Sequence, residues 1–264
     1  MHRRKFIGTI GSAAAAAAMP AHFLQGESGK LHIVSLSFDD GFRKSFLRIA
    51  EIYEKFSLSA CFNIIASAHM PGNQVRDDYM KQELFGDFTV WNELQDRGHE
   101  IMPHGYRHAH LASLPLEEAK DLIRECLDVF SRQLRGFDPR KAVFNFPYNQ
   151  SSSALEEWLP SVVMAFRTTG GVINPLPGSH TVKITTGGWG PDSAEKDVDA
   201  CVERLLAQPS GWMAYNLHGL DEEGWGPVSP GYLENLLSRL RKIDSVRILP
   251  TARTLMQARA GSLA

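Results

Sequence analysis

The sequence predicts an α/β protein, a distorted (β/α) barrel of about seven parallel strands. Three observations support this fold class. Short apolar runs of strand length alternate with segments of helical spacing, which is typical of βα units and a parallel sheet. Seven such runs occur, as many as a closed or nearly closed barrel needs. The chain of 264 residues, 43% of them hydrophobic, can bury one large core, and it contains no internal repeat and no obvious linker.

The predicted strands are short, mainly apolar and bounded by polar or turn-forming residues. They cover residues 31–38, 60–66, 99–103, 142–147, 161–166, 212–217 and 245–249. The clearest predicted helix covers 116–130, where apolar residues recur at helical spacing from Leu116 to Phe130. Strands and helices therefore alternate along most of the chain.

Similar patterns predict helices over 89–97, 193–207 and 231–242. Two polar segments, 67–88 and 168–191, are predicted to be loops. Loops at the carboxyl ends of parallel strands build the active sites of α/β proteins, so the polar residues at these ends are the candidate functional residues.

Residues 1–25 have the layout of an export signal, with a basic start, a short apolar stretch and small residues at its end. Arg3 and Arg4, followed by Lys5, resemble the twin-arginine type. The Ala-rich centre is too short and too weakly hydrophobic for a stable membrane span, and an uncleaved amphipathic helix or a short anchor is the alternative. We expect an exported protein, periplasmic or extracellular, whose single domain covers 26–264.

The charge and the cysteine content of the chain limit the kinds of ligand and partner that it can bind. A net charge of −2, a pI near 6.6 and the lack of a basic block outside the N-terminus argue against nucleic acid. Cys61, Cys126 and Cys201 are widely spaced and odd in number, so they are interpreted as buried small hydrophobes rather than metal ligands or disulfides.

Polar or turn-forming residues follow four of the predicted strands. These residues are Asp39 and Asp40, His104, Pro147 and Tyr148, and His218. Each alone has an ordinary explanation, because Asp-Gly is a common turn and a single His at a strand end is usually a hydrogen-bonded core residue. Together they would converge at one end of a parallel barrel, which indicates a functional site.

A bound metal ion would account for this group of polar residues at the strand ends. Two imidazoles four residues apart, His104 and His108, can reach one ion, and Asp40 completes a three-ligand site with open positions. A dication also relieves the repulsion between Asp40 and its neighbour Asp39. Asp39 is then predicted to be the general base on water, and His218 the general acid for the leaving group.

Further residues are predicted to line the substrate groove. A backbone N–H at the Pro147-Tyr148 turn is placed to hold a developing oxyanion. Trp189, Trp225 and Tyr148 can form an apolar platform for a sugar ring or an acetyl methyl group, with ordinary core packing as the alternative. His110 is interpreted as a groove residue, because a site of this kind keeps an open position instead of a fourth protein ligand.

These residues resemble the motifs of carbohydrate esterase family 4, the NodB-type polysaccharide deacetylases. "SFDDG" resembles the first motif, "HGYRH" the second, "NFPYN" the third and "NLH" the last. The resemblance implies a NodB-like barrel, a divalent metal, most simply zinc, and hydrolysis of N- or O-linked acetyl groups on a glycan. It also implies that Asp39 is the base, Asp40, His104 and His108 the metal ligands, and His218 the acid.

The third motif departs from the family pattern. Its first residue is usually an Arg that orients the base, and Asn145 stands there; the Gly that usually ends it is Asn149. Asn145 is expected to line the site and can hydrogen-bond Asp39, but it supplies no charge, so we expect the pKa of Asp39 to be less depressed than a neighbouring Arg would make it.

The fourth motif also departs from the pattern, because the resemblance implies an Asp that tunes the catalytic His beside a Trp. Trp189 fits the Trp, whereas the Asp is absent from the expected place, and Asp192 or Asp221 are the candidates.

Three functions follow as hypotheses. The first is an exported, metal-dependent deacetylase of an acetylated polysaccharide or oligosaccharide. The second keeps the fold but opens a small non-sugar amide. The third is a glycan-binding protein whose site is impaired by the missing Arg and Asp.

Overall fold

The computed structural model describes residues 29–72, 80–188, 190 and 193–263. The predicted export signal, Trp189, Asp192 and part of the predicted loop 67–88 lie outside these residues. The strands are β1 His32–Phe38, β2 Cys61–Ile64, β3 Glu100–Pro103, β4 Val143–Asn145, β5 Ala165–Thr169, β6 Ile173–Asn174, β7 Lys183–Thr186, β8 Gly211–Leu217 and β9 Val246–Ile248. The α-helices are α1 Arg43–Glu54, α2 Phe88–Asp96, α3 Leu116–Gln133, α4 Ser153–Trp158, α5 Ala194–Leu206, α6 Pro230–Leu240 and α7 Thr251–Arg259.

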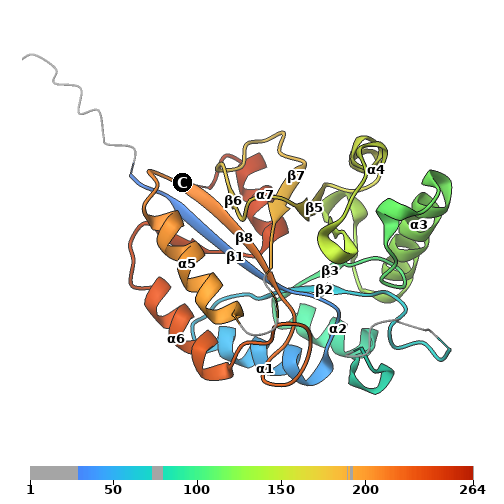
Figure 1. The fold of residues 1–264 in the computed structure, drawn as a ribbon, viewed down its shortest axis with the longest axis horizontal. Helices are drawn as coiled ribbons and strands as arrows, with labels where there is room; N and C mark the ends of the chain where they lie inside the picture. The colour runs from blue at the N-terminus through green and yellow to red at the C-terminus, as the bar shows by residue number, and fades with distance from the viewer. Residues whose placement is uncertain (1–28, 73–79, 189, 191–192, 264) are drawn as a thin grey trace, which may run out of the picture.

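Two sheets form the two arcs of one distorted barrel (Figure 1). The larger sheet has the order β3-β2-β1-β8-β6, with β9 beside the first half of β1. The smaller sheet has the order β4-β5-β7. All pairs are parallel except β6 with β8. The predicted fold class, an α/β barrel of mainly parallel strands, is therefore confirmed.

The two arcs meet at both seams without a full ladder. At one seam an isolated parallel bridge joins Gly187, just after β7, to Tyr215 of β8. At the other, between β3 and β4, the Asn145 side chain donates to the carbonyl of Pro103 at 3.3 Å. The backbone N–H of Val143 faces the sulfur of Met102 at 3.3 Å across the same seam. The barrel is thus closed by a single backbone bridge at one seam and by side-chain contacts at the other.

Helices surround the strands and bury one face each. In α1, the residues at helical spacing that point inward include Phe46, Ile49 and Tyr53, which are almost fully buried. α1 packs against α6, and α5 packs against β8 (Figure 1). Because the strands are covered by helices outside and filled inside, β1 and β8 are buried at every residue. The three cysteines are free and buried, as predicted.

The predicted elements agree with the structure except around residues 159–191. The run 161–166 was expected to be a strand, but Leu159–Ser161 forms a 3-10 turn and the strand β5 starts only at Ala165. The turn is closed by the N–H of Val162, which donates to the carbonyl of Leu159 at 3.0 Å. The segment 168–191 was expected to be a loop, yet it contains β6 and β7.

Within the part of the chain that the structure describes, none of the helices is long and apolar enough to cross a membrane.

The loop after β8 is tied to the start of α1 by one carboxylate. Glu223 accepts hydrogen bonds from the backbone N–H and the hydroxyl of Ser45, at 2.9 and 2.5 Å. Residue Phe42 at the N-cap of α1 supplies no side-chain hydrogen bond, and the first turn contains no acidic residue. Glu223 therefore provides the anion that the N-terminus of this helix favours.

We expect Glu223→Ala to lower the free energy of unfolding by about 1 kcal/mol, the usual loss when a helix N-terminus loses its cap. Urea denaturation followed by circular dichroism measures this change. Glu222→Ala, an exposed neighbour in the same loop, is the matched control and should unfold at the wild-type midpoint. Equal midpoints for both variants would contradict the capping role.

Candidate active site and metal centre

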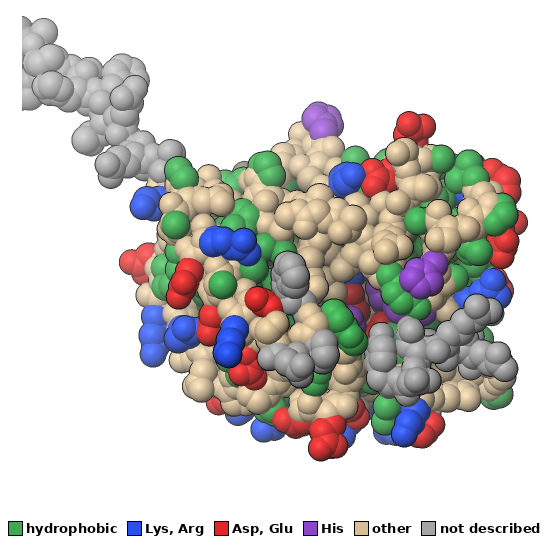
Figure 2. Space-filling model, viewed as in Figure 1, with side chains coloured by type: hydrophobic (Ala, Val, Ile, Leu, Met, Phe, Trp, Pro, Cys, Tyr) green, Lys and Arg blue, Asp and Glu red, His purple; other side chains and the backbone are tan. Residues whose placement is uncertain are grey.

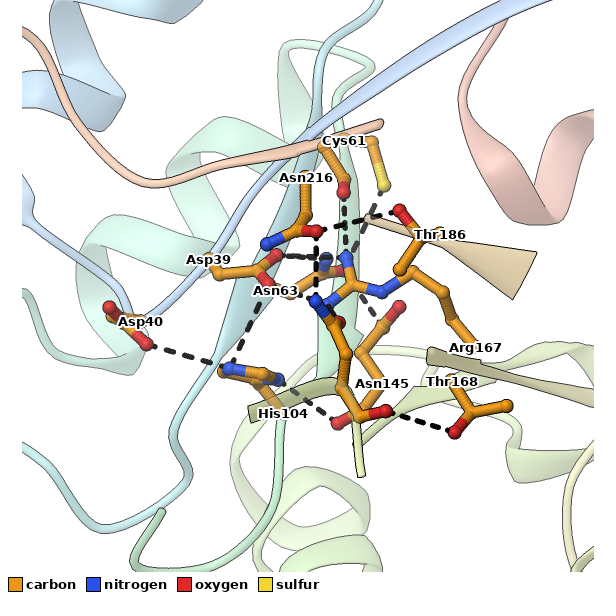
Figure 3. Close-up of polar contacts among 12 residues, drawn as sticks. Asp39, Asp40, Cys61, Asn63, His104, Asn145, Arg167, Thr168, Thr186 and Asn216 are labelled. Carbon is orange, nitrogen blue, oxygen red and sulfur yellow. Dashed lines mark hydrogen bonds and ion pairs between the residues drawn. The ribbon is translucent and has the colours of Figure 1, made fainter. Parts of the chain in front are cut away.

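The site begins where β1 ends. β1 stops at Phe38, and the next two residues, Asp39 and Asp40, turn into the barrel with 1% and 0% of their surface exposed. Asp40 has φ 82° and Gly41 has φ 109°, a conformation that Asp tolerates better than most residues and that Gly adopts freely. The tight turn directs the two neighbouring carboxylates apart, although Nε2 of His104 lies near both, 3.5 Å from Oδ1 of Asp40 and 3.8 Å from Oδ2 of Asp39 (Figure 3).

Asp40, His104 and His108 come together as the sequence predicts. The Nε2 atoms of both histidines lie 3.5 Å from Oδ1 of Asp40. One potential ligand atom from each residue lies within 4.8 Å of the others, and all three residues are buried. His104 follows β3 directly and His108 has φ 54°, so the loop folds back to bring the second imidazole beside the first.

The chemistry of these groups fits a divalent ion. Neither carboxylate oxygen of Asp40 has a hydrogen-bond partner among the described residues, although both are buried. An unpartnered buried carboxylate is costly unless a cation balances it. Nδ1 of His104 donates to the carbonyl of Asn145 at 3.0 Å, which leaves Nε2 as the free ligand atom, facing Asp40. Two imidazoles and a carboxylate with open positions are a suitable donor set for zinc or a similar ion.

Asp39 is held by a different cation, the guanidinium of Arg167 on β5. Nη2 of Arg167 lies 2.5 Å from Oδ2 of Asp39, and Nη1 lies 3.0 Å from Oδ1 (Figure 3). The side-chain amide of Asn63 adds a bond of 2.6 Å to Oδ1. Burial raises the pKa of Asp39, but the charge and hydrogen bonds of Arg167, together with the neighbouring His104 and His218, hold that pKa well below the usual range.

This arrangement corrects the expectation drawn from Asn145. Asn145 does not bond Asp39. The side-chain amide nitrogen of Asn145 donates at 2.9 Å to Oδ1 of Asn63, and the amide nitrogen of Asn63 donates to Asp39. The weakly depressed pKa expected for Asp39 was wrong, because Arg167 supplies the missing charge.

Asn149 has a structural reason to replace Gly. It has φ 54°, a left-handed conformation in which Asn is the usual substitute for Gly. Its amide oxygen accepts from Nη2 of Arg167 at 3.3 Å, and its amide nitrogen donates to Asn216 at 3.0 Å. Asn149 therefore connects Arg167 to β8.

His218 follows β8 and lines the same cavity as His104 and His108. Burial lowers the pKa of its imidazole, and the charges of Asp40 and Asp39 partly oppose this. Among the described residues, which include Asp221 but not Asp192, no side chain forms a hydrogen bond with its Nδ1 atom. Trp225 packs edge-on against the imidazole, with ring centroids 5.9 Å apart, and remains 39% exposed.

Tyr148 forms the third side of the site. It follows Pro147 in a short 3-10 turn after β4 and has φ 57°. Its ring stacks on His110 with a centroid distance of 3.5 Å and an interplanar angle of 6°, and it lies 4.4 Å from the ring of His108. His110 is exposed and lies outside the group of three potential ligands, and its role in a substrate groove stays a prediction.

A cavity of about 340 Å³ brings most of these groups together. Its lining includes Asp39, His104, His108, Tyr148, Asn149, Gly188, Asn216, His218 and Trp225. Figure 2 views the molecule from the side on which acidic and histidine side chains are visible inside a hollow. The cavity has room for a small acyl group and one edge of a larger ligand.

A barrel that places the buried carboxylate of Asp39 beside a potential metal site has an arrangement suited to a hydrolase. A model of the family described as polysaccharide deacetylase matches residues 27–166, more than half of the chain. The chain therefore belongs to the polysaccharide deacetylase family, hydrolases that remove acetyl groups from sugars. A comparison with curated protein sequences finds no match.

Solved structures share the fold at low identity. A putative polysaccharide deacetylase from Mycobacterium smegmatis has a TM-score of 0.63 at 14% identity, covering 96% of both chains. A family 4 acetyl xylan esterase from Clostridium thermocellum, in complex with a cobalt ion, has a TM-score of 0.57 at 18% identity, covering 85% of this chain and 90% of that one. The peptidoglycan deacetylase PdaC from Bacillus subtilis has a TM-score of 0.54 at 15% identity, covering 88% and 93%.

Arg167 is the site residue that the sequence interpretation missed. The predicted strand ended at residue 166 and a loop was expected from 168, so nothing placed Arg167 inside the barrel. A signal existed, because "AFRTT" at 165–169 is a β-prone run with a single central charge. Such a charge in a strand that is buried on both faces requires a buried counter-charge.

We expect His108→Gln to weaken zinc or cobalt binding by more than about 100-fold, because changes behind a ligand already cost about 10–100-fold. Metal content after reconstitution, measured by mass spectrometry, and the cobalt absorption spectrum report the loss. His110→Gln, the same substitution two residues later, should keep the metal. Stoichiometric metal in His108→Gln protein would exclude the proposed ligand set.

Proposed function

We propose that this protein is an exported deacetylase that uses a divalent metal, most simply zinc, to remove acetyl groups from a polysaccharide or oligosaccharide. One observation carries the proposal: a buried carboxylate base, a potential metal site and a histidine acid line the same cavity. Asp39 and His218 are proposed as the catalytic residues, and Asp40, His104 and His108 as the metal ligands.

Each residue of the proposed site has a defined task. A divalent ion bound by the three ligands would act as a Lewis acid and lower the pKa of water. Asp39, kept ionised by Arg167, takes a proton from the attacking water. His218 delivers a proton to the leaving nitrogen or oxygen, and a backbone N–H at Pro147–Tyr148 stabilises the oxyanion. Asn145 acts behind the site, since it supports His104 and Asn63.

The surfaces beside the cavity support a sugar substrate. Trp225 is 39% exposed on one side, and Tyr148 is stacked on exposed His110 on another. Flat aromatic faces bind the apolar faces of sugar rings. Trp189, which lies outside the described residues, is proposed to contribute to the same surface. The acetyl xylan esterase and the peptidoglycan deacetylase named above act on acetylated glycans, according to their descriptions. An acetylated glycan is also a substrate found where the predicted export signal would deliver the protein.

We expect metal-reconstituted protein to release acetate from acetylated xylan, chitin or peptidoglycan fragments, and Asp39→Asn to lower kcat by about 10²- to 10⁴-fold, the usual contribution of a general base. Acetate is measured by a coupled enzymatic assay, with chelated protein as a second inactive sample. Asp121→Asn, whose carboxylate is 73% exposed on α3, is the matched control and should retain full activity.

The same assay separates the substrates. Small linear and cyclic amides tested beside the acetylated glycans should be poor substrates. Turnover confined to the small amides would replace the glycan by a non-sugar substrate, and undiminished turnover by Asp39→Asn would remove Asp39 from the mechanism.

A further inference from the structure

We infer that Arg167 on β5 is the positioning residue of the general base, a task that the resembled third motif would give to the position of Asn145 on β4. The inference rests on the proposed function, because it assigns the task of Arg167 through Asp39. It concerns a residue outside the four motifs that the sequence resembles.

The sheet register allows either position to serve this task. Asn145 on β4 and Arg167 on β5 are paired neighbours in a parallel ladder. Paired residues of adjacent strands project to the same face and lie about 5 Å apart, a distance that the long side chain of Arg easily spans. A guanidinium attached at either position therefore reaches the same carboxylate. Both side chains are 1% exposed and bond partners inside the barrel, Asn145 to Asn63 and Arg167 to Asp39.

The contacts of Arg167 are those of a clamp. It engages both oxygens of Asp39, and Nη1 also donates to the hydroxyl of Ser37 at 2.7 Å. A bidentate pair fixes the plane of the carboxylate as well as its charge. Because Ser37 and Asp39 belong to the same segment, the clamp joins β5 directly to the end of β1, across the barrel interior (Figure 3).

The neighbouring residues are matched to an Arg at position 167. Asn145, at the position that the motif gives to Arg, is small and neutral and uses its amide to hold Asn63, the second donor to Asp39. Asn149 accepts from Nη2 of Arg167 at 3.3 Å, a contact that a Gly at this position could not make. The departures at 145 and 149 are thus parts of one arrangement around Arg167.

The test first removes the guanidinium from position 167 and then places one at position 145. Arg167→Gln should lower kcat by about 100-fold, the loss expected when the base is no longer held, with little change in KM and without loss of the bound metal. The double variant Asn145→Arg/Arg167→Asn should recover most of that loss, and Arg167→Lys, which keeps the charge but not the bidentate contact, should fall between. Arg124→Gln, a surface arginine of α3 whose side chain is 51% exposed, is the matched control.

A substrate-free measurement keeps the inference separate from the proposed function. The thermal midpoints of the wild-type protein, Arg167→Gln, Asp39→Asn and the combined variant Arg167→Gln/Asp39→Asn form a thermodynamic cycle. Arg167→Gln should lower the midpoint strongly, because it leaves a buried charge unpaired, and adding Asp39→Asn should restore part of it.

The outcomes are distinct. Additive midpoints, or wild-type kcat in Arg167→Gln protein, would overturn the inference. Failure of the wild-type protein to release acetate would instead count against the proposed function, while the cycle would still decide whether Arg167 and Asp39 act as a pair.

Discussion

The structure of the site depends on one electrostatic constraint: Asp39 and Asp40 are adjacent and buried, and the pKa of each carboxyl lies below its usual value. Two carboxylates so placed repel each other unless each has its own positive partner. The turn at Asp40 and Gly41 separates them, so that Asp39 faces the guanidinium of Arg167 and Asp40 faces two imidazoles and a potential metal position. Leaving either carboxylate without its cation would cost about 3–5 kcal/mol. The division of labour between base and ligand follows from this separation.

Backbone strain is concentrated where the chemistry is proposed. Asp40, His108, Tyr148 and Asn149 all have positive φ, and all four lie at or beside the cavity. Such conformations cost of order 1 kcal/mol or more for residues other than Gly, and they persist only when the surroundings determine them. Here the surroundings are rigid strand ends and fully packed helices. The barrel thus stabilises loop conformations that bring ligands and base to one point.

The barrel interior below the site is polar and almost continuously hydrogen-bonded. Asn63 donates to Asp39, and the thiol of Cys61, two residues earlier on β2, lies 3.2 Å from the carboxylate of Glu100. That carboxylate accepts the first backbone N–H groups of α7, from Ala252 and Arg253. A buried network of this kind specifies one arrangement of the strands, because each unpaired member would be destabilising. The strand β2 therefore carries both a donor to Asp39, Asn63, and a contact to the carboxylate that α7 binds.

The sequence alone determined the class of fold and the identities of the proposed base, metal ligands and acid, because strand period, Asp-Asp and His-x-x-x-His are local patterns. It did not reveal Arg167, the two short strands β6 and β7, or the absence of a carboxylate at Nδ1 of His218 among the described residues. These features depend on register between strands that are about 20 residues apart and on which side chains a barrel brings together across its interior. Only the tertiary structure decided them, since the partner of a buried charge is set by neighbours in space and not by neighbours in the chain.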